Sequence, residues 1–296
     1  MNFDYYRTFY YVGKFKSVTL ASKELFTSQP AVTRTIKNLE HELGCRLFSR
    51  SKKGMELTRD GEILFGYVSA SFNQLEKGEL EIRKHTSSKE GHITIGATVT
   101  ALDEFLFSFV KQFSQSYPNI KFKILSESTN KTIGKLRNGL IDVALITTPH
   151  QSFDDVEFYK IMEFKNILIA GNNFRYLADK EISLKSINDY PFVAMEEKTQ
   201  LREYTNRLFL ENSLLINPSI EVDSAGLLIP FVRNNLGLSI VPYSLAKNSI
   251  ERGDLISLNV MENIPNRDVC LVTSKVLPLS NATRTFIKEI KNLAKK

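Results

Sequence analysis

Near the start of the chain, apolar side chains recur at helical spacing in three successive segments. They are Tyr6, Phe9 and Val12, then Val18, Ala21 and Leu25, then Val32, Ile36, Leu39 and Leu43. At about 100° per residue, each set lies along one side of a helix and can pack against a core. Ser17 and Ser28 precede the second and third segments, where their hydroxyls can cap free N–H groups. Pro30 is tolerated in a first turn because its missing N–H would have had no partner there. We therefore predict three short helices.

The second and third helices are separated only by Phe26-Thr27 and the capping serine, which is the spacing of a helix-turn-helix. The following stretch, CRLFSRSKKGMELT at 45–58, predicts two short strands around Lys53-Gly54, with basic residues at or beside the turn. We expect a small helical module that carries a basic wing.

A long helix is predicted next. Residues 59–86 contain no proline and follow Thr58, which can cap a helix. One side of this helix carries Leu64, Val68, Phe72, Leu75 and Ile82. At a rise of 1.5 Å per residue the helix would be ~40 Å long, too long to bury its stripe against a sixty-residue module. A second copy of the helix is the expected partner, although two glycines lower the helix propensity and the stripe is not a strict heptad. HTSSKEGH at 85–92 predicts a hinge.

From His92 onwards strands and helices alternate, which predicts parallel sheets with helical crossovers. The expected strands are HITIGA, IKFKILS and IDVALIT in a first series and KNILIAG, YPFVAM, SIEVD and GLSIVP in a second. The expected helices are FLFSFVKQFSQSYP, KTIGKLRNG, LREYTNRLFLEN and AGLLIPFVRNN. A late strand, DVCLVTS, and the helix after Ser280 are expected to return to the first series. The fold class is thus α+β with several domains, ending in two α/β lobes.

Charge changes the picture because it is concentrated at one end. The chain of 296 residues has a net charge of +6, and its first sixty residues hold eleven Lys or Arg against six Asp or Glu. A basic module on a nearly neutral body indicates a polyanion partner, with DNA or RNA favoured over a membrane surface. The first residues contain no apolar signal-peptide core and no apolar run approaches membrane-spanning length, so a cytoplasmic protein is expected. Cys45 and Cys270 are expected to be reduced thiols.

The outer face of the third helix suits base recognition. In a helix-turn-helix the second helix of the motif enters the major groove by its N-terminal end. Arg34 can grip guanine with two hydrogen bonds, Gln29 suits adenine, and the methyl groups of Ala31 and Thr33 can meet a thymine methyl. The other reading is a solvated helix face and a solvated turn. The expected DNA-binding set is Ser28, Gln29, Pro30, Ala31, Thr33, Arg34 and Lys37 with the wing cations Arg50, Lys52 and Lys53.

These residues resemble the winged helix-turn-helix of LysR-type transcriptional regulators. The matching positions are Phe9, Ser17, Ala21, Leu25, SQPAVTR at 28–34, Ile36, LE at 39–40, LG at 43–44, LFSR at 47–50, LT at 57–58 and Gly61. Thr33 departs from the usual serine and Asp60 from a small residue. The resemblance implies a winged helix-turn-helix over 1–58, a dimerisation helix and hinge over 59–90, and an effector-binding domain over 91–296. The two lobes of that domain, about 91–161 with 265–296 and 162–264, are similar to periplasmic binding proteins.

Polar residues at the carboxyl ends of the predicted strands mark a ligand site, because open α/β sheets bind ligands beyond those ends. Hydroxyls and helix N-termini with one arginine suit a small carboxylate or another anion, although the same residue types also serve as ordinary caps. The expected effector-binding set is Thr98, Thr100, Ser126, Ser128, Thr147, Thr199 and Arg202.

Enzyme and cofactor motifs are missing from the sequence. GHITIGAT has the glycine spacing of a phosphate loop, but Ala97-Thr98 stands where Lys and Ser/Thr are required. There is no Gly-x-Gly pair, and the four histidines lack the spacing of metal ligands. We expect no cofactor, metal or catalytic residue. A redox switch between the two cysteines is disfavoured because they fall in different predicted domains.

Two classes of function follow. The first is a sequence-specific regulator that binds an interrupted palindrome of double-stranded DNA as a homodimer or homotetramer. A small-molecule effector would change promoter bending or contact with RNA polymerase. The second is a cytoplasmic solute-binding protein or an enzyme with an incidental basic extension. Specific DNA binding that survives moderate salt and weakens on Arg34→Ala separates them, and we favour the first.

Overall fold

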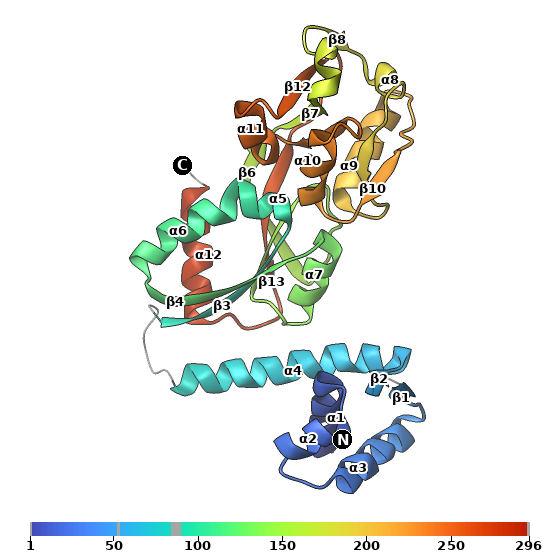
Figure 1. Ribbon diagram of the computed structural model, residues 1–296. Helices are drawn as coiled ribbons and strands as arrows, with labels where there is room; N and C mark the ends of the chain where they lie inside the picture. The colour runs from blue at the N-terminus through green and yellow to red at the C-terminus, as the bar shows by residue number, and fades with distance from the viewer. Residues whose placement is uncertain (1, 52–53, 84–89, 295–296) are drawn as a thin grey trace. The chain divides into compact units, whose positions relative to one another are not determined.

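The computed structural model describes residues 2–51, 54–83 and 90–294. The chain divides into two compact units, one made mainly of the first 85 residues and the other of the remainder (Figure 1). Each unit has a hydrophobic core of its own, formed by one cluster of buried residues in the first unit and by three clusters in the described part of the second. Among the described residues, none of the helices combines the length and the apolar character that a membrane span requires.

The first unit begins with the three predicted helices: α1 Phe3–Phe15, α2 Val18–Glu24 and α3 Gln29–Leu43. The Ser17 hydroxyl accepts a hydrogen bond from the Leu20 N–H at 3.3 Å, and the Ser28 hydroxyl accepts one from the Ala31 N–H at 3.4 Å. Both predicted caps are therefore confirmed.

The apolar stripe of α3 turns inward, with one exception at its end. Val32, Ile36 and Leu39 are buried, whereas Leu43 is 43% exposed. Placing Leu43 on the packed face was wrong, because α3 ends there and Gly44 turns the chain at φ 69°. In the turn that precedes α3, Phe26 also has a positive φ of 51°, and its side chain is 96% exposed.

The wing is a short antiparallel pair, β1 Phe48–Ser51 and β2 Gly54–Leu57, with Ser51 opposite Gly54. Lys52 and Lys53, at its tip, lie outside the described residues. The Glu40 carboxylate on α3 accepts hydrogen bonds from the N–H groups of Leu47 at 2.8 Å and Phe48 at 3.2 Å. This contact ties the start of the wing to α3.

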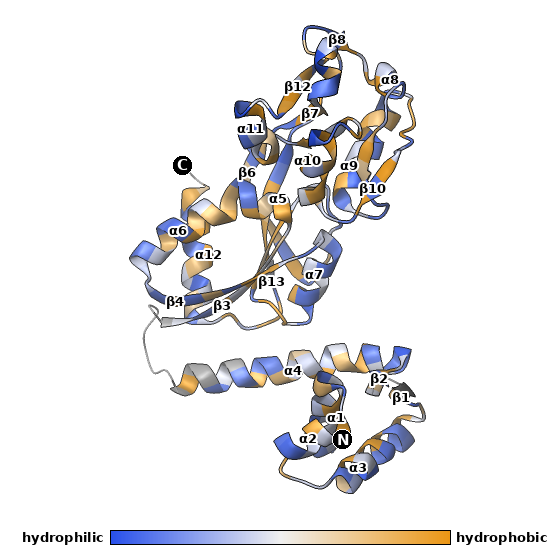
Figure 2. Cartoon of the chain, in the orientation of Figure 1, coloured by the Kyte–Doolittle hydropathy of each residue, from blue (hydrophilic) through white to orange (hydrophobic). Residues whose placement is uncertain are grey.

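Helix α4 spans Arg59–Arg83, and the Thr58 hydroxyl accepts a hydrogen bond from the Gly61 N–H at 3.0 Å, as predicted. A side chain at Gly61 would place its Cβ 2.1 Å from the Leu47 carbonyl oxygen, so this position requires glycine. Val68 is buried in the core of the unit, whereas Leu75 is 51% and Ile82 is 70% exposed. Figure 2 shows hydrophobic and hydrophilic residues following one another along α4.

The predicted hinge at 85–92 falls largely outside the described residues. For residues 90–92 the prediction of a hinge was wrong, because they already belong to the first strand of the second unit.

The first lobe of this unit is built on a five-stranded sheet in the order β4-β3-β5-β13-β6. Strands β3, β4 and β5 are parallel, but β13 runs antiparallel to both of its neighbours. The predicted parallel arrangement of β3, β4 and β5 is therefore confirmed, whereas the direction of β13 and the strand β6 were not predicted. The bounds are β3 Glu90–Ala97, β4 Asn119–Ser126, β5 Val143–Thr147, β6 Val156–Phe164 and β13 Arg267–Ser274.

Helices cover both faces of this sheet. Figure 1 shows α6 and α12 on one side and α7 on the other. Along β5, Val143 and Leu145 join the core under α6 and α12, while Ala144 and Ile146 join the core under α7. Burial on both faces explains the continuous apolar run of β5. The helices are α5 Val99–Ala101, a π-helical turn Leu102–Leu106, α6 Phe107–Ser116, α7 Thr129–Arg137 and α12 Asn281–Leu293.

The second lobe has a four-stranded sheet in the order β11-β7-β12-β8 and a parallel β10-β9 pair. A bridge between Phe192 and Leu238 links the pair to the larger sheet. Its strands are β7 Asn166–Gly171, β8 Glu181–Ile182, β9 Val193–Met195, β10 Ile220–Val222, β11 Ser239–Pro242 and β12 Leu255–Val260. Its helices are a 3-10 helix Asn172–Leu177, α8 Leu184–Ile187, α9 Gln200–Glu211, α10 Ala225–Arg233 and α11 Tyr243–Glu251. Strands β8 and β12 and helices α8 and α11 were not predicted.

The chain passes between the lobes twice. Lys165 alone separates β6 from β7, and residues 261–266 separate β12 from β13. The late strand β13 then pairs with β5 and β6, so the predicted return to the first lobe is confirmed.

Candidate DNA interface and effector cavity

The N-terminal half of α3 presents a continuous exposed surface in the first unit. Ser28, Gln29, Pro30, Ala31, Arg34 and Lys37 are exposed, and Thr33 is half-buried. A shallow hollow on this surface is lined by Val18, Gln29, Pro30, Thr33, Arg34 and Lys37. The buried side chains on the opposite side of α3 fix the orientation of this surface. The structure therefore brings most of the predicted recognition residues together on one helix end.

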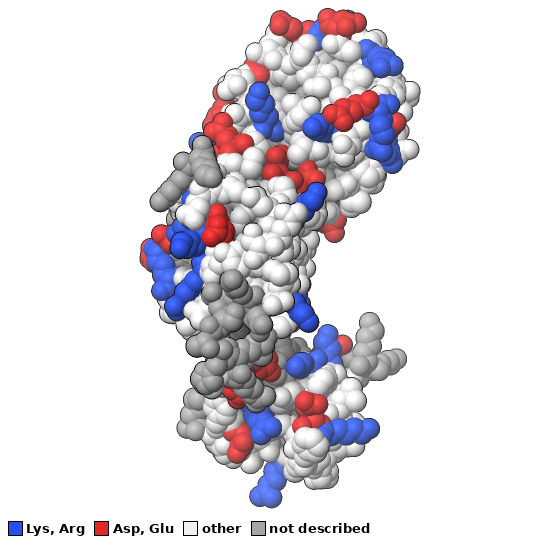
Figure 3. Space-filling view, turned by 90° about the vertical axis from the view of Figure 1, so that its left-hand side faces the viewer, with Lys and Arg blue, Asp and Glu red and all other residues white. Residues whose placement is uncertain are grey.

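The wing cations are described less completely. Arg50 lies in β1 opposite Met55, and Lys52 and Lys53 are outside the described residues. These three positions remain predictions. On the face shown in Figure 3, acidic and basic side chains are mixed, with no area of a single sign.

In the second unit, a cavity of about 790 Å³ has walls from both lobes. It lies beyond the carboxyl ends of β3, β4 and β5 of the first lobe and of β9 and β10 of the second. Six of the seven predicted effector-binding residues line it, namely Thr98, Thr100, Ser126, Ser128, Thr147 and Thr199.

Several of these hydroxyls already take part in local hydrogen bonds. The Thr98 hydroxyl accepts a bond from the Ala101 N–H at 3.3 Å. The Thr199 hydroxyl accepts one from the Arg202 N–H at 3.3 Å and donates to the Glu196 carbonyl at 2.9 Å. Thr199 thereby fixes the start of α9, whose first residues Gln200 and Leu201 also line the cavity.

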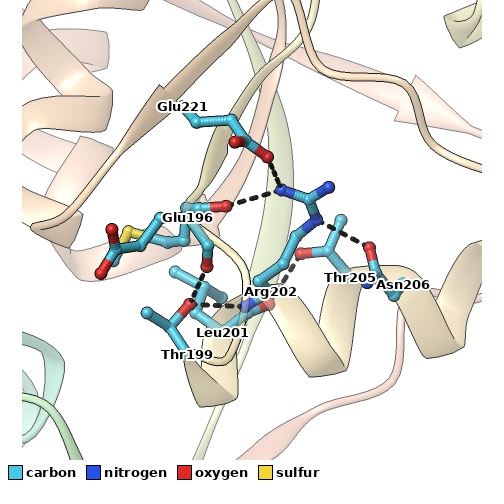
Figure 4. Close-up of polar contacts among 8 residues, drawn as sticks. Glu196, Thr199, Leu201, Arg202, Thr205, Asn206 and Glu221 are labelled. Carbon is cyan, nitrogen blue, oxygen red and sulfur yellow. Dashed lines mark hydrogen bonds and ion pairs between the residues drawn. The ribbon is translucent and has the colours of Figure 1, made fainter.

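Arg202, the seventh predicted residue, is not on the cavity wall, and assigning it to the effector was wrong. Its side chain is buried and forms an ion pair with Glu221 (Figure 4). It also donates to the Met195 carbonyl oxygen and to the Asn206 side chain, both at 2.8 Å. These contacts use the guanidinium to join α9 to β9 and β10, so it is not available to a ligand anion.

The arginine on the cavity wall is Arg267, the first residue of β13. It is 3% exposed, donates from Nη2 to the Thr147 hydroxyl at 2.7 Å and from Nε to the Thr148 carbonyl at 2.5 Å. Its guanidinium carbon lies 5.1 Å from the Tyr204 ring centre and 5.4 Å from that of Phe164. Burial lowers the pKa of Arg267 to about 10, so the group stays charged at neutral pH.

Arg267 could not be found by looking at the carboxyl ends of strands. Because β13 is antiparallel to β5, the first residues of β13 lie at the same end of the sheet as the last residues of β5. Val269 of β13 pairs with Thr147 of β5. The direction of β13 was the missing information. An arginine directly before a predicted strand was the only available signal.

Thiol reactivity and metal binding are the remaining kinds of site chemistry to consider. Cys270 is buried on β13, and burial raises the pKa of its thiol to about 11, so the nucleophilic thiolate is scarce at neutral pH. Within the described ranges, no cluster of three or more His, Cys, Asp or Glu side chains is placed to hold a metal ion.

Family profiles match both units. The profile described as bacterial regulatory helix-turn-helix protein, lysR family, matches residues 3–62, and that of the LysR substrate binding domain matches residues 86–295. The chain belongs to the LysR family. It is a LysR-type transcriptional regulator with a helix-turn-helix unit for DNA and a second unit of the type that binds small-molecule effectors.

Full-length LysR-type proteins resemble the whole chain. The regulator CysL of Bacillus subtilis (strain 168) is 25% identical over 99% of this chain and 97% of its own length. The structure of the LysR family regulator CbnR matches all of both chains with a TM-score of 0.75 and 18% identity, and full-length CbnR complexed with its target DNA matches with 0.60. The effector binding domain of QuiR in complex with shikimate covers 70% of this chain and 98% of its own, with a TM-score of 0.63 and 21% identity. The two-lobed α/β fold predicted from the sequence is confirmed.

Proposed function

We propose that this LysR-type regulator binds an interrupted palindrome as a homodimer or a homotetramer, with α3 of each protomer in one half-site. The observation that carries the proposal is the exposed surface at the N-terminal end of α3, which is held in place by Val32, Ile36 and Leu39. CbnR, which shares the fold, has been solved with its target DNA. A regulator that binds the bacterial chromosome acts in the cytoplasm, and regulation rather than catalysis is its function.

The residues of this surface have different roles. Arg34 pairs with guanine through two hydrogen bonds, Gln29 pairs with adenine, and Ala31 and Thr33 contact thymine methyl groups. Ser28 and Pro30 set the start of the helix, so that its first N–H groups meet a phosphate. Lys37 and the wing residues Arg50, Lys52 and Lys53 neutralise phosphates or enter the minor groove.

Self-association is assigned to α4. Leu75 and Ile82, which follow Phe72 on this helix, are more than half exposed, so the described part of the first unit leaves them largely uncovered. A second copy of α4 would cover them, since two such stripes are complementary to each other.

The cavity of the second unit is assigned to a small effector that carries a negative charge. Hydroxyls of both lobes, the helix N-termini at Ser128 and Thr199, and Arg267 favour such a ligand. The effector binding domain of QuiR, which resembles this unit, has been solved with shikimate. Binding would close the two lobes and change the relative placement of the DNA-binding units in the oligomer, and with it promoter bending or contact with RNA polymerase.

Genome-wide DNA capture tests the proposal directly. The wild-type protein should give sharp peaks at a few promoters, and Arg34→Ala should lose them. Loss of a bidentate base contact costs about 1–3 kcal/mol, or roughly 5- to 150-fold in specific affinity. Arg7→Ala is the matched control, because Arg7 is an exposed arginine on α1 that does not line the α3 hollow.

Diffuse occupancy that Arg34→Ala leaves unchanged would contradict specific recognition by α3. It would favour an incidental basic surface, whose binding shows only the salt-sensitive, non-specific component.

A further inference from the structure

The wall of the effector cavity contains three residues that each have a buried side-chain atom without a hydrogen-bond partner among the described residues. The atoms are Nη1 of Arg267, Oε1 of Gln200 and Oε2 of Glu127. The first is a donor on a cation, and the other two are acceptors. Buried polar atoms are nearly always paired in folded proteins, so three on one cavity wall indicate the groups that a ligand supplies.

Arg267 is the most unusual of the three. Its side chain lies among Thr147, Thr148, Phe164 and Tyr204, and no carboxylate within the described residues forms an ion pair with it. Buried charges are otherwise paired, because the loss of hydration is costly. An anionic group of a ligand would complete the hydrogen bonds of the guanidinium and neutralise its charge.

Gln200 and Glu127 require the opposite chemistry. The Gln200 amide nitrogen donates to Asn130 at 3.2 Å, which leaves the amide oxygen on the cavity wall without a donor. Oε1 of Glu127 is held by Lys135, while Oε2 has no partner in the described parts of the chain. Both oxygens can accept a hydrogen bond from an O–H or N–H group of a ligand.

The charged side chains around the cavity further restrict the chemical class of ligand that it can bind. Its wall includes five acids and three cations, namely Glu127, Glu196, Glu197, Glu221 and Asp223 against Lys131, Lys198 and Arg267. Because Glu127 is paired with Lys135 and Glu221 with Arg202, three acids and three cations remain on the wall, so it has no surplus of positive charge to attract a molecule with several negative charges. An inorganic oxyanion such as sulfate would reach Arg267, but it has no donor for Gln200 or Glu127.

We infer that the effector is a small monocarboxylate that also bears hydroxyl or amino groups, with its carboxylate on Arg267 and its donors on Gln200 and Glu127. The inference rests on the proposed effector function of this cavity and defines its ligand class. Hydroxy acids and amino acids share this chemistry, and the experiment below separates them.

The position of Arg267 connects this ligand class to lobe closure. Arg267 pairs with Phe164, the last residue of β6, directly beside one of the two crossovers between the lobes. Tyr204, whose ring faces the guanidinium, comes from α9 of the second lobe and donates from its hydroxyl to the Pro265 carbonyl in the other crossover at 2.6 Å. A carboxylate on Arg267 therefore binds at the hinge and contacts both lobes.

The test measures binding of defined compounds to the full-length protein by thermal shift and calorimetry. The hydroxy-acid arm contains glycerate and shikimate, and the amino-acid arm contains serine and glutamine. Each acid is paired with its primary amide, which keeps the donors and removes the charge. Propionate and sulfate supply anions without hydrogen-bond donors, and inorganic phosphate supplies an oxyanion whose only donors are on the charged group itself. We expect acids of one arm to bind, and their amides to bind at least about 30-fold more weakly.

Variants locate the binding groups. Arg267→Gln should weaken the binding of the acid about 30-fold or more, and Gln200→Leu about 5-fold. Arg207→Gln is the matched control, because Arg207 lies on the same helix as Gln200 with its side chain 74% exposed. Its affinity should equal that of the wild type. If Arg267→Gln does not fold, the comparison of each acid with its amide on the wild-type protein decides the question alone.

Equal binding of acids and amides, preference for sulfate or phosphate, or unchanged binding by Arg267→Gln would overturn the assignment, as would the failure of every acid to bind. None of these results would remove the promoter peaks of the wild-type protein, whose loss would be the failure of the proposed regulatory function. The two conclusions therefore fail in different experiments.

Discussion

At the scale of single residues, Phe26 is in a conformation that is unfavourable for its type. Its φ of 51° is in the left-handed region, which costs an L-residue with a Cβ roughly 1–2 kcal/mol. Its side chain is 96% exposed, so packing does not offset this cost. Asparagine tolerates the left-handed region better because its side chain can hydrogen-bond locally.

We therefore predict that Phe26→Asn raises the free energy of unfolding of the first unit by about 1 kcal/mol. Urea denaturation followed by circular dichroism measures the change. Phe26→Ala is the matched control, since it removes the ring and keeps the strained backbone with an ordinary side chain. Equal stabilities of the two variants would show that the strain at Phe26 is not the cause.

Residue-level predictions succeeded where the interaction is local. Ser17, Ser28 and Thr58 each cap the helix that follows within three residues, and this geometry depends only on neighbouring sequence. Arg202 and Arg267 show where prediction from local sequence fails. The environment of each arginine depends on which strands lie beside it, and the partner of Arg202, Glu221, is nineteen positions away in another element.

At the scale of elements, α4 has two different parts. Phe65 and Phe72 stack against Tyr10 of α1, at centroid distances of 6.0 and 4.7 Å. The later positions Leu75 and Ile82 are exposed. The first part of α4 therefore stabilises the first unit, and the second part carries the exposed side chains to which we assign self-association.

We predict that Leu75→Glu weakens self-association and raises the dissociation constant of the dimer at least about 100-fold. Burial of a leucine contributes about 1.5–3 kcal/mol per copy, and a buried unpaired carboxylate adds a further cost. Analytical ultracentrifugation measures the change. Ile63→Glu makes the same type of substitution at an exposed site about 120° around the helix. A dimer that dissociates equally in both variants, or in neither, would contradict the assignment.

Among the strands, those with a simple pattern were predictable and those with an interrupted pattern were not. The fully apolar run of β5 and the flanking turn residues identified that strand. Strand β6 carries a more irregular mixture of buried and exposed positions, and its register with β13 shifts between Val269 and Cys270. A shift of this kind breaks the alternation of sides on which strand prediction depends.

At the scale of the whole molecule, the order of the units and the return of β13 followed from the sequence, because each is expressed in the order of strands and helices along the chain. The direction of β13 within the sheet did not. Its own pattern is the same for either direction, and only the position of the chain after β12 decides it.

At this scale we predict that the binding of operator DNA and the binding of effector affect each other. If lobe closure changes the placement of the DNA-binding units, operator DNA and effector must alter each other's affinity by the same factor, typically 5- to 150-fold. Calorimetric titration of the effector with and without saturating operator measures this factor. In Arg34→Ala, which should not bind the operator specifically, added DNA should leave the affinity for the effector unchanged. Equal affinities of the free and DNA-bound wild-type protein would contradict coupling by lobe closure.

The two crossovers between the lobes also determine the order in which the protein can fold as it leaves the ribosome. The second lobe occupies one continuous stretch, from β7 to β12, and can be completed while synthesis continues. The first lobe cannot, because β13, which fills the space between β5 and β6, follows the whole second lobe in the chain. Until β13 emerges, β5 and β6 each present an unpaired edge that could pair with another nascent chain. The lobe whose synthesis starts first is thus the one completed last.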